Sequence, residues 1–364
     1  MPSRKKIKKI EEQDFHISGP VHLTRAAAWT NPDQGRCIIA SLVQGVYCLE
    51  YDRLRVLQGK RHRHGAQALA PPWWESIHFR LFRVLEDVDG SIIGAIYEYE
   101  HEHPPSPQNP DVPRYVIAFR GIIRKRRIIL KDLTSGLGWV LNELQRRSSR
   151  FHCAMHEVQQ RVAVAGAQNV WLAGHSLGAA IAMVVGKNMV IKKNCLLKTY
   201  LFNPPFVGIP IDSLINDEKL KQGIRFASTG VKAILINAVA LAGDLHHQQR
   251  HDHDSFAAVS RWQPYLFVNK NDPICAGYID YFRKREEMKQ SGAETERIAE
   301  KSSIVSLFSS AVFGGDLEAS HLLPSAHVTT NTGSTPDVEQ AHGIDQWWDR
   351  FLISESMLYQ YHPH

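Results

Sequence analysis

The stretch Gly-His-Ser-Leu-Gly at residues 174–178 lies between a strand-like apolar run, residues 169–173, and a helix-like run, residues 179–185. A G-x-S-x-G motif in this setting is typical of the tight strand-to-helix turn called a nucleophile elbow. Its two glycines leave room for the strand and the helix to approach, while the serine is held in a strained conformation with its hydroxyl exposed. The motif alone is short enough to arise by chance, so the flanking strand and helix decide the interpretation.

Apolar runs and turn signals elsewhere in the chain predict further strands and helices. Residues 115–119 form a short, continuous apolar run, which is typical of a strand buried on both faces of a sheet. Asp89-Gly90 is a turn pair that predicts a hairpin. The other predicted elements are hairpin strands at residues 79–86 and 91–100, strands at 199–203 and 265–268, and helices at 37–49, 154–165 and 281–301. This alternation predicts an α/β fold with a mostly parallel central sheet and helices on both faces.

Length and composition are those of an ordinary globular protein. The chain has 364 residues, of which 43% are hydrophobic and 22% are charged. We expect a basic, disordered tail over residues 1–14 and a single domain over residues 15–360 with an insertion at about residues 209–261, because no Pro/Gly/Ser-rich linker divides the chain. The charged amino terminus lacks the apolar run of a secretory signal, and the five cysteines have no framework spacing. A reducing, cytoplasmic location is therefore expected.

Charge and hydropathy restrict the expected partners. The net charge of +6 comes from scattered basic clusters without a recognised binding module, so nucleic acid is not expected as a partner. The apolar segment 231–243 is too short and too interrupted to span a bilayer. It is either a core-packed helix or a lid or interfacial helix in peripheral contact with a membrane. The histidine-rich tract 246–253 lacks regular metal-ligand spacing, so a solvated loop is expected there in preference to a zinc site.

A serine hydroxyl is a weak nucleophile at neutral pH, so the elbow needs a histidine as general base and a carboxylate to orient that histidine. In elbow-bearing hydrolases these residues come in the order Ser, Asp, His. Asp272 comes just after the strand-like run 265–268, although its Asn-Asp-Pro sequence also suits an ordinary turn. His342, next to a glycine and close to two tryptophans, is the favoured base, and the residues alone leave His321 and His327 open as alternatives.

Several of these segments resemble the class 3 (fungal-type) lipase-like α/β-hydrolases, in particular the plant branch labelled GDSL esterase/lipase. The resemblance is carried by residues 115–121, 173–179, 203–207, 268–273, 341–344 and 347–348, with additional similarity to the plant branch at 18–20, 40–46 and 68–74. It implies an α/β-hydrolase fold with Ser176 as nucleophile, Asp272 as orienting acid and His342 as base. We therefore expect a serine esterase or lipase that acts on lipid or small-ester substrates through an acyl-enzyme and requires no cofactor.

One position departs from the pattern of that family. The residue after Phe-Arg-Gly is usually Ser or Thr, whose hydroxyl joins the oxyanion hole, whereas this chain has Ile122. The N–H groups of Leu177 and Ile122 are then the expected donors, and the missing hydroxyl can cost ~10²-fold in turnover. Asp132 stands where the family often has an aspartate that braces this loop, and it equally suits a helix start.

Two other functions remain open at the level of sequence. The first is a binding or scaffold protein of hydrolase fold, in which the altered oxyanion loop leaves weak catalysis or none. The second is an acyltransferase that uses the same triad and passes the acyl group to an alcohol instead of water. Both keep the fold. In the first the serine forms an acyl-enzyme slowly or not at all, whereas in the second the acyl-enzyme forms and its acyl group passes to an alcohol.

Overall fold

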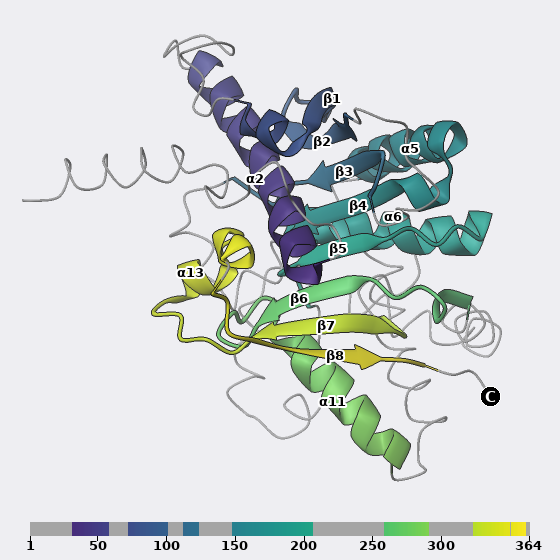
Figure 1. Cartoon of the computed structure of the whole chain (residues 1–364), viewed down its shortest axis with the longest axis vertical. Helices are drawn as coiled ribbons and strands as arrows, with labels where there is room; N and C mark the ends of the chain where they lie inside the picture. Colours follow the sequence, from purple (N-terminus) through teal and green to yellow (C-terminus); the bar gives the residue numbers. More distant parts are fainter. Residues whose placement is uncertain are drawn as a thin grey trace, which may run out of the picture.

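The computed structural model describes residues 31–57, 72–100, 112–123, 148–206, 258–290, 323–349 and 351–361. Within these ranges eight strands form one sheet in the order β1 to β8 (Figure 1). The strands are β1 (Phe79–Glu86), β2 (Ile92–Tyr99), β3 (Tyr115–Phe119), β4 (Val170–His175), β5 (Thr199–Phe202), β6 (Tyr265–Asn269), β7 (Ala326–Asn331) and β8 (Ser354–Tyr359). Strands β3 to β7 are parallel, whereas β2 is antiparallel to both of its neighbours and β8 is antiparallel to β7.

Helices pack on both faces of this sheet. Side chains alternate along a strand, so Val116 and Ala118 of β3 join one apolar cluster while Ile117 and Phe119 join another. The first cluster is covered by α2 (Pro32–Leu57), which crosses the strands in Figure 1, and the second by α5 (Ser148–Ala165), α6 (Leu177–Lys193) and α11 (Gly277–Gln290). This arrangement, with a strand-to-helix elbow between β4 and α6, is an α/β-hydrolase fold and confirms the predicted fold class.

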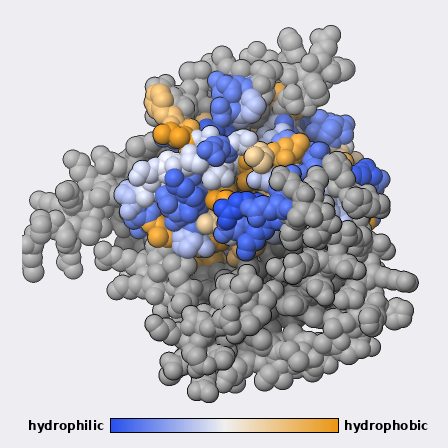
Figure 2. Space-filling view, turned by 90° about the horizontal axis from the view of Figure 1, so that it is seen from below, coloured by the Kyte–Doolittle hydropathy of each residue, from blue (hydrophilic) through white to orange (hydrophobic). Residues whose placement is uncertain are grey.

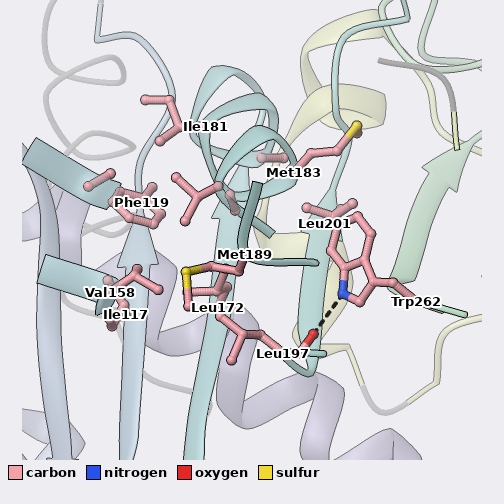
Figure 3. Packing of buried hydrophobic residues seen from close by; sticks show 14 of the residues in the cluster. Ile117, Phe119, Val158, Leu172, Ile181, Met183, Met189, Leu197, Leu201 and Trp262 are labelled. Carbon is pink, nitrogen blue, oxygen red and sulfur yellow. Dashed lines mark hydrogen bonds between the residues drawn. The ribbon is translucent and has the colours of Figure 1, made fainter. Parts of the chain in front are cut away.

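The packing of α6 on the sheet is close and almost entirely apolar (Figure 3). Met183 and Met189 of the helix lie over Leu172 and Leu201 of the strands. The indole N–H of Trp262 donates a hydrogen bond of 2.8 Å to the carbonyl of Leu197, so this polar group is satisfied inside the core. The elbow helix is thereby fixed against the strands that precede and succeed it in the chain.

Most of the predicted elements are confirmed, with some differences at their ends. The hairpin forms as expected, and Gly90 has a positive φ of 73° in its turn. Helix α2 begins earlier than predicted because the Asn31 side chain accepts the N–H of Asp33 at 2.9 Å and Pro32 suits the first helical position. Helix α11 begins at Gly277, four residues before the predicted start.

Strands β7 and β8 were missed by the sequence analysis. Several of its expectations lie outside the described residues. They are the tail 1–14, positions 209–257 of the insertion with the apolar segment 231–243 and the tract 246–253, Asp132, His321, and the predicted helix beyond residue 290.

The described surface is mixed in character. In the view from below, hydrophilic and hydrophobic residues occur in small groups side by side (Figure 2). No helix in the described ranges is both long enough and apolar enough to cross a bilayer.

A pair of glycine substitutions tests the packing of the elbow helix. A Cβ at Gly178 would lie 2.3 Å from the carbonyl oxygen of Phe119, whereas a Cβ at Gly35 in α2 would meet only the Tyr200 hydroxyl at 3.7 Å. Alanine favours a helix over glycine by ~1 kcal/mol at both positions. We expect Gly178→Ala to lower the free energy of unfolding by about 2 kcal/mol or more, because backbone must move, and Gly35→Ala to raise it slightly. Urea unfolding measures both, and an equal effect of the two substitutions would contradict the close packing.

Candidate active site

The serine of the motif lies in a strained turn between β4 and α6. Ser176 has φ 54° and ψ −123°, and its N–H donates to the carbonyl of Phe202 on the neighbouring strand at 2.9 Å. A Cβ at Gly174 would lie 2.2 Å from the carbonyl oxygen of Gly178, so both flanking glycines are required by the approach of strand and helix. The elbow predicted from the sequence is confirmed in its backbone geometry. Such strain is typical of functional sites.

His342 and Asp272 lie next to this serine in a hydrogen-bonded row. The Nε2 atom of His342 is 3.0 Å from Ser176 Oγ, and its Nδ1 atom is 2.8 Å from Asp272 Oδ2. Because an ionised carboxylate only accepts, Nδ1 carries the proton and Nε2 is free to accept the serine hydroxyl proton. Asp272 comes after β6, and His342 ends the short helix α13 (Val338–His342). Three residues that are far apart in sequence are therefore brought together in the order that nucleophilic catalysis uses.

The carboxylate of Asp272 is fully buried, and every hydrogen bond it makes favours its charged form. Its Oδ2 atom accepts from Asn203 Nδ2 at 2.7 Å and from the thiol of Cys275 at 3.1 Å, and its Oδ1 atom accepts the N–H of Ile274 at 3.0 Å. Burial acts to raise the pKa of Asp272, but His342, Asn203 and Cys275 outweigh it, so the pKa is lowered. The group is held as a carboxylate that orients the imidazole.

Asn203 is a site residue that the sequence analysis quoted without giving it a role. It has a positive φ of 45° at the end of β5 and is fully buried. Its Nδ2 group donates to Asp272 and also to the carbonyl of Ala341 at 3.1 Å, while its Oδ1 atom accepts the indole N–H of Trp347. Asn203 thus ties the acid to the backbone next to His342. The signal in the sequence is an Asn-Pro-Pro step directly after a strand, which marks an unusual backbone turn.

The loop after β3 lies against Ser176 on its other side. We refer to residues 120–122 as the oxyanion loop. A Cβ at Gly121 would lie 2.8 Å from Cβ of Ser176, so the loop touches the elbow. The guanidinium of Arg120 donates to the carbonyl of Gly121 at 2.7 Å, and in a trans peptide this fixes the opposite direction for the N–H of Ile122. Leu177 is the first residue of α6, where backbone N–H groups have no partner within the helix.

The described histidine that was left open as an alternative to His342, and the aspartate that follows Asp272 in the chain, have other surroundings. His327 lies in β7 with its ring stacked on Tyr265 at 5.0 Å, and burial lowers its pKa. Asp280, the next aspartate along the chain, is exposed on α11 and pairs with Arg283 at 2.6 Å. Neither side chain is hydrogen-bonded to Ser176 or to His342 in the described part of the chain.

Known proteins that are similar to this chain are described as lipases or esterases. The family described as Lipase (class 3) matches residues 116–219. A GDSL esterase/lipase of Arabidopsis thaliana is 38% identical over 362 residues, which cover 96% of this chain and 99% of the relative. Among solved structures, an esterase of Pyrobaculum calidifontis is 13% identical with a TM-score of 0.30 and covers 78% of this chain and 99% of its own. A thermostable carboxylesterase cloned from a metagenomic library is 14% identical with a TM-score of 0.29 and the same coverage.

The lowered pKa of Asp272 predicts a contribution to stability that depends on pH. A carboxyl group whose pKa is lower in the folded state stabilises the fold above its unfolded value, about 3.9, and loses this contribution as pH falls through the folded value. Asp272→Asn removes the titration, so the free energy of unfolding should fall less steeply between about pH 5 and pH 2 than in the wild type. Asp280→Asn is the matched control, because an exposed pair contributes little. Equal slopes for wild type and Asp272→Asn would contradict the description of this carboxylate.

Proposed function

The chain belongs to the family of lipase-like plant proteins that includes the Arabidopsis thaliana GDSL esterase/lipase, and on that premise we propose that it hydrolyses carboxylic esters with Ser176 as nucleophile. One observation carries the proposal. The hydroxyl of Ser176, the imidazole of His342 and the carboxylate of Asp272 form a continuous hydrogen-bonded row with separations of 3.0 Å and 2.8 Å. These distances are within the reach that proton transfer from a nucleophile requires.

In the first half of the reaction, Ser176 Oγ attacks the ester carbonyl carbon while His342 Nε2 takes the hydroxyl proton. The negative charge that develops on the carbonyl oxygen is stabilised by the N–H groups of Leu177 and Ile122. The tetrahedral intermediate then collapses, the bond to the alcohol oxygen breaks, and His342 returns the proton to the leaving alcohol. The product of this half is an acyl-enzyme on Ser176, and Asp272 accepts the Nδ1 proton of His342 throughout, which orients the neutral ring and stabilises the imidazolium that forms.

In the second half, water takes the place of the alcohol. His342 removes a proton from the water, whose oxygen attacks the acyl carbon, and the same two N–H groups stabilise the second tetrahedral intermediate. Collapse releases the carboxylic acid and returns the proton to Ser176. All bonds made and broken involve this chain's own residues, the ester and water, so neither a metal nor an organic cofactor takes part.

The substrate class that we propose is a lipid-like ester. Support comes from the class 3 lipase family, which matches the segment that contains the elbow, and from the esterase/lipase name of the Arabidopsis relative. Peripheral contact with a membrane, through the apolar segment 231–243, belongs to the same proposal. Single-domain organisation over residues 15–360 likewise stays a proposal.

The first test is Ser176→Ala, assayed with p-nitrophenyl esters of short and long acyl chains and with phospholipids. We expect turnover to fall by about 10⁴-fold or more, because the nucleophile is removed. The melting temperature should stay nearly unchanged, since a single oxygen is lost from a half-buried turn. Retained turnover in this variant would place the nucleophile elsewhere. Added alcohol acceptors in the same assay separate hydrolysis from acyl transfer, because a transferase would form a new ester in place of free acid.

A second test concerns the departure at Ile122. Ile122→Thr adds a hydroxyl near the charge that develops in the transition state, so kcat should rise, by up to about 10²-fold, with a smaller change in KM. Ile122→Val is the matched control, because valine has nearly the shape of threonine and lacks the hydroxyl. If the side chain instead packs on the acyl chain, both variants would raise KM on a long-chain ester and neither would raise kcat. That result would mean that the N–H groups of Leu177 and Ile122 suffice to stabilise the oxyanion without a hydroxyl.

A further inference from the structure

The hydroxyl of Tyr47 lies on the far side of the oxyanion loop from the nucleophile. Tyr47 is on α2, and its hydroxyl accepts the N–H of Gly121 at 2.7 Å. A Cβ at Gly121 would lie 2.6 Å from this hydroxyl and 2.8 Å from Cβ of Ser176. The loop is therefore confined between the tyrosine hydroxyl and the nucleophile, with no space for a larger residue. A shift of either neighbour would move the peptide that precedes Ile122.

The same hydroxyl is connected to the histidine of the elbow motif. His175 is buried, with Nδ1 at 2.7 Å from the hydroxyl of Tyr47 and Nε2 at 2.8 Å from the carbonyl oxygen of His342. A carbonyl only accepts, so Nε2 carries the proton, and in a neutral imidazole Nδ1 is then an acceptor. The hydroxyl of Tyr47 consequently donates to His175 and uses its lone pairs for Gly121. The carbonyl of His342 thus determines which group donates in each hydrogen bond between His342, His175 and Tyr47.

Helix α2 also holds the other side of Gly121. Glu50 lies three residues after Tyr47, on the same face of the helix, and its carboxylate is 3.5 Å from the guanidinium of Arg120. Arg120 is buried and donates to the carbonyl of Gly121. The N–H and the C=O of this glycine are thus both fixed from α2, one directly by Tyr47 and one through the ion pair.

We propose, on the basis of the proposed function, that Tyr47 is a positioning residue for the reaction. Its hydroxyl holds the oxyanion loop and, through His175, the backbone that carries His342. It contacts neither the reacting atoms nor the proton that moves, so it acts through the residues that do. The two hydrogen bonds of this hydroxyl hold the loop that carries the N–H of Ile122 and, through His175, the backbone of the base. They therefore affect the geometry in which charge develops, and small misplacements of such groups are costly.

Tyr47→Phe removes the hydroxyl and keeps the ring. We expect kcat for a p-nitrophenyl ester to fall about 10- to 100-fold, because the loop and the base lose their common partner, while KM changes by less than about 3-fold. Tyr281→Phe is the matched control. Its hydroxyl likewise donates one hydrogen bond and accepts another, since it donates to the carbonyl of Leu323 at 2.9 Å and accepts from Arg285, but it lies on α11. The control should lose similar stability in urea and keep the wild-type kcat, and equal values of kcat in the two variants would overturn the proposal.

The link through His175 is tested by a double-mutant cycle. His175→Gln keeps a donor near the Nε2 position and removes the acceptor for Tyr47. If the two residues act together, Tyr47→Phe should reduce kcat by a clearly smaller factor in the His175→Gln background than in the wild type. The same factor in both backgrounds would overturn the link. Ser176→Ala, measured alongside, separates this proposal from the proposed function: if that variant keeps turnover, the function itself fails and the positioning role with it.

Discussion

The backbone of Ser176, with φ 54° and ψ −123°, is the constraint on which the rest of the site depends. A residue with a side chain is destabilised in such a conformation, so surrounding contacts must impose it. The hydrogen bond from the N–H of Ser176 to the carbonyl of Phe202 ties the turn to β5. The absence of a side chain at Gly178 lets α6 approach the carbonyl of Phe119 in β3. Three adjacent strands and one helix therefore fix the position of a single hydroxyl. Everything else in the site is arranged around that point.

A buried carboxylate can serve this hydroxyl only because its charge is well compensated. Asp272 is fully buried, and an unpaired charge in such a place would be costly. Its donors come from the end of β5, from the turn after β6 and from α13, so the hydrogen bonds that keep it ionised also hold these three segments together. Stability and the proposed chemistry thus share the same contacts. Removing one donor is expected to disturb both, so a control variant that affects stability alone is needed to separate the two effects.

Much of the fold could be predicted from the sequence because its signals are local. The two glycines of the elbow stand where the close approach of strand and helix leaves no room for a side chain. Buried parallel strands such as β3 are continuous apolar runs. Strand β7 was missed because four of its six residues are polar, and β8 because most of its side chains are exposed, so neither has the apolar run of a central strand. The choice of His342 over His327 could not be made from the residues alone, since it depends on how the chain brings the end of α13 next to the turn that follows β6. The roles of Asn203 and Tyr47 depend on contacts between distant segments. The Asn-Pro-Pro step indicates an unusual turn at Asn203 but does not reveal its partners, and Tyr47 has no signal in a single sequence.

The central claim is that His342 activates Ser176, and the rate of covalent modification by a fluorophosphonate tests it most directly. Such a probe reacts with an activated serine and needs no knowledge of the natural substrate. Mass spectrometry of the digested protein locates the adduct. The account predicts one adduct, on the peptide that contains Ser176, formed rapidly in the wild type and about 10³-fold or more slowly in His342→Ala. An adduct on another residue, or an equal rate in the His342→Ala variant, would contradict it.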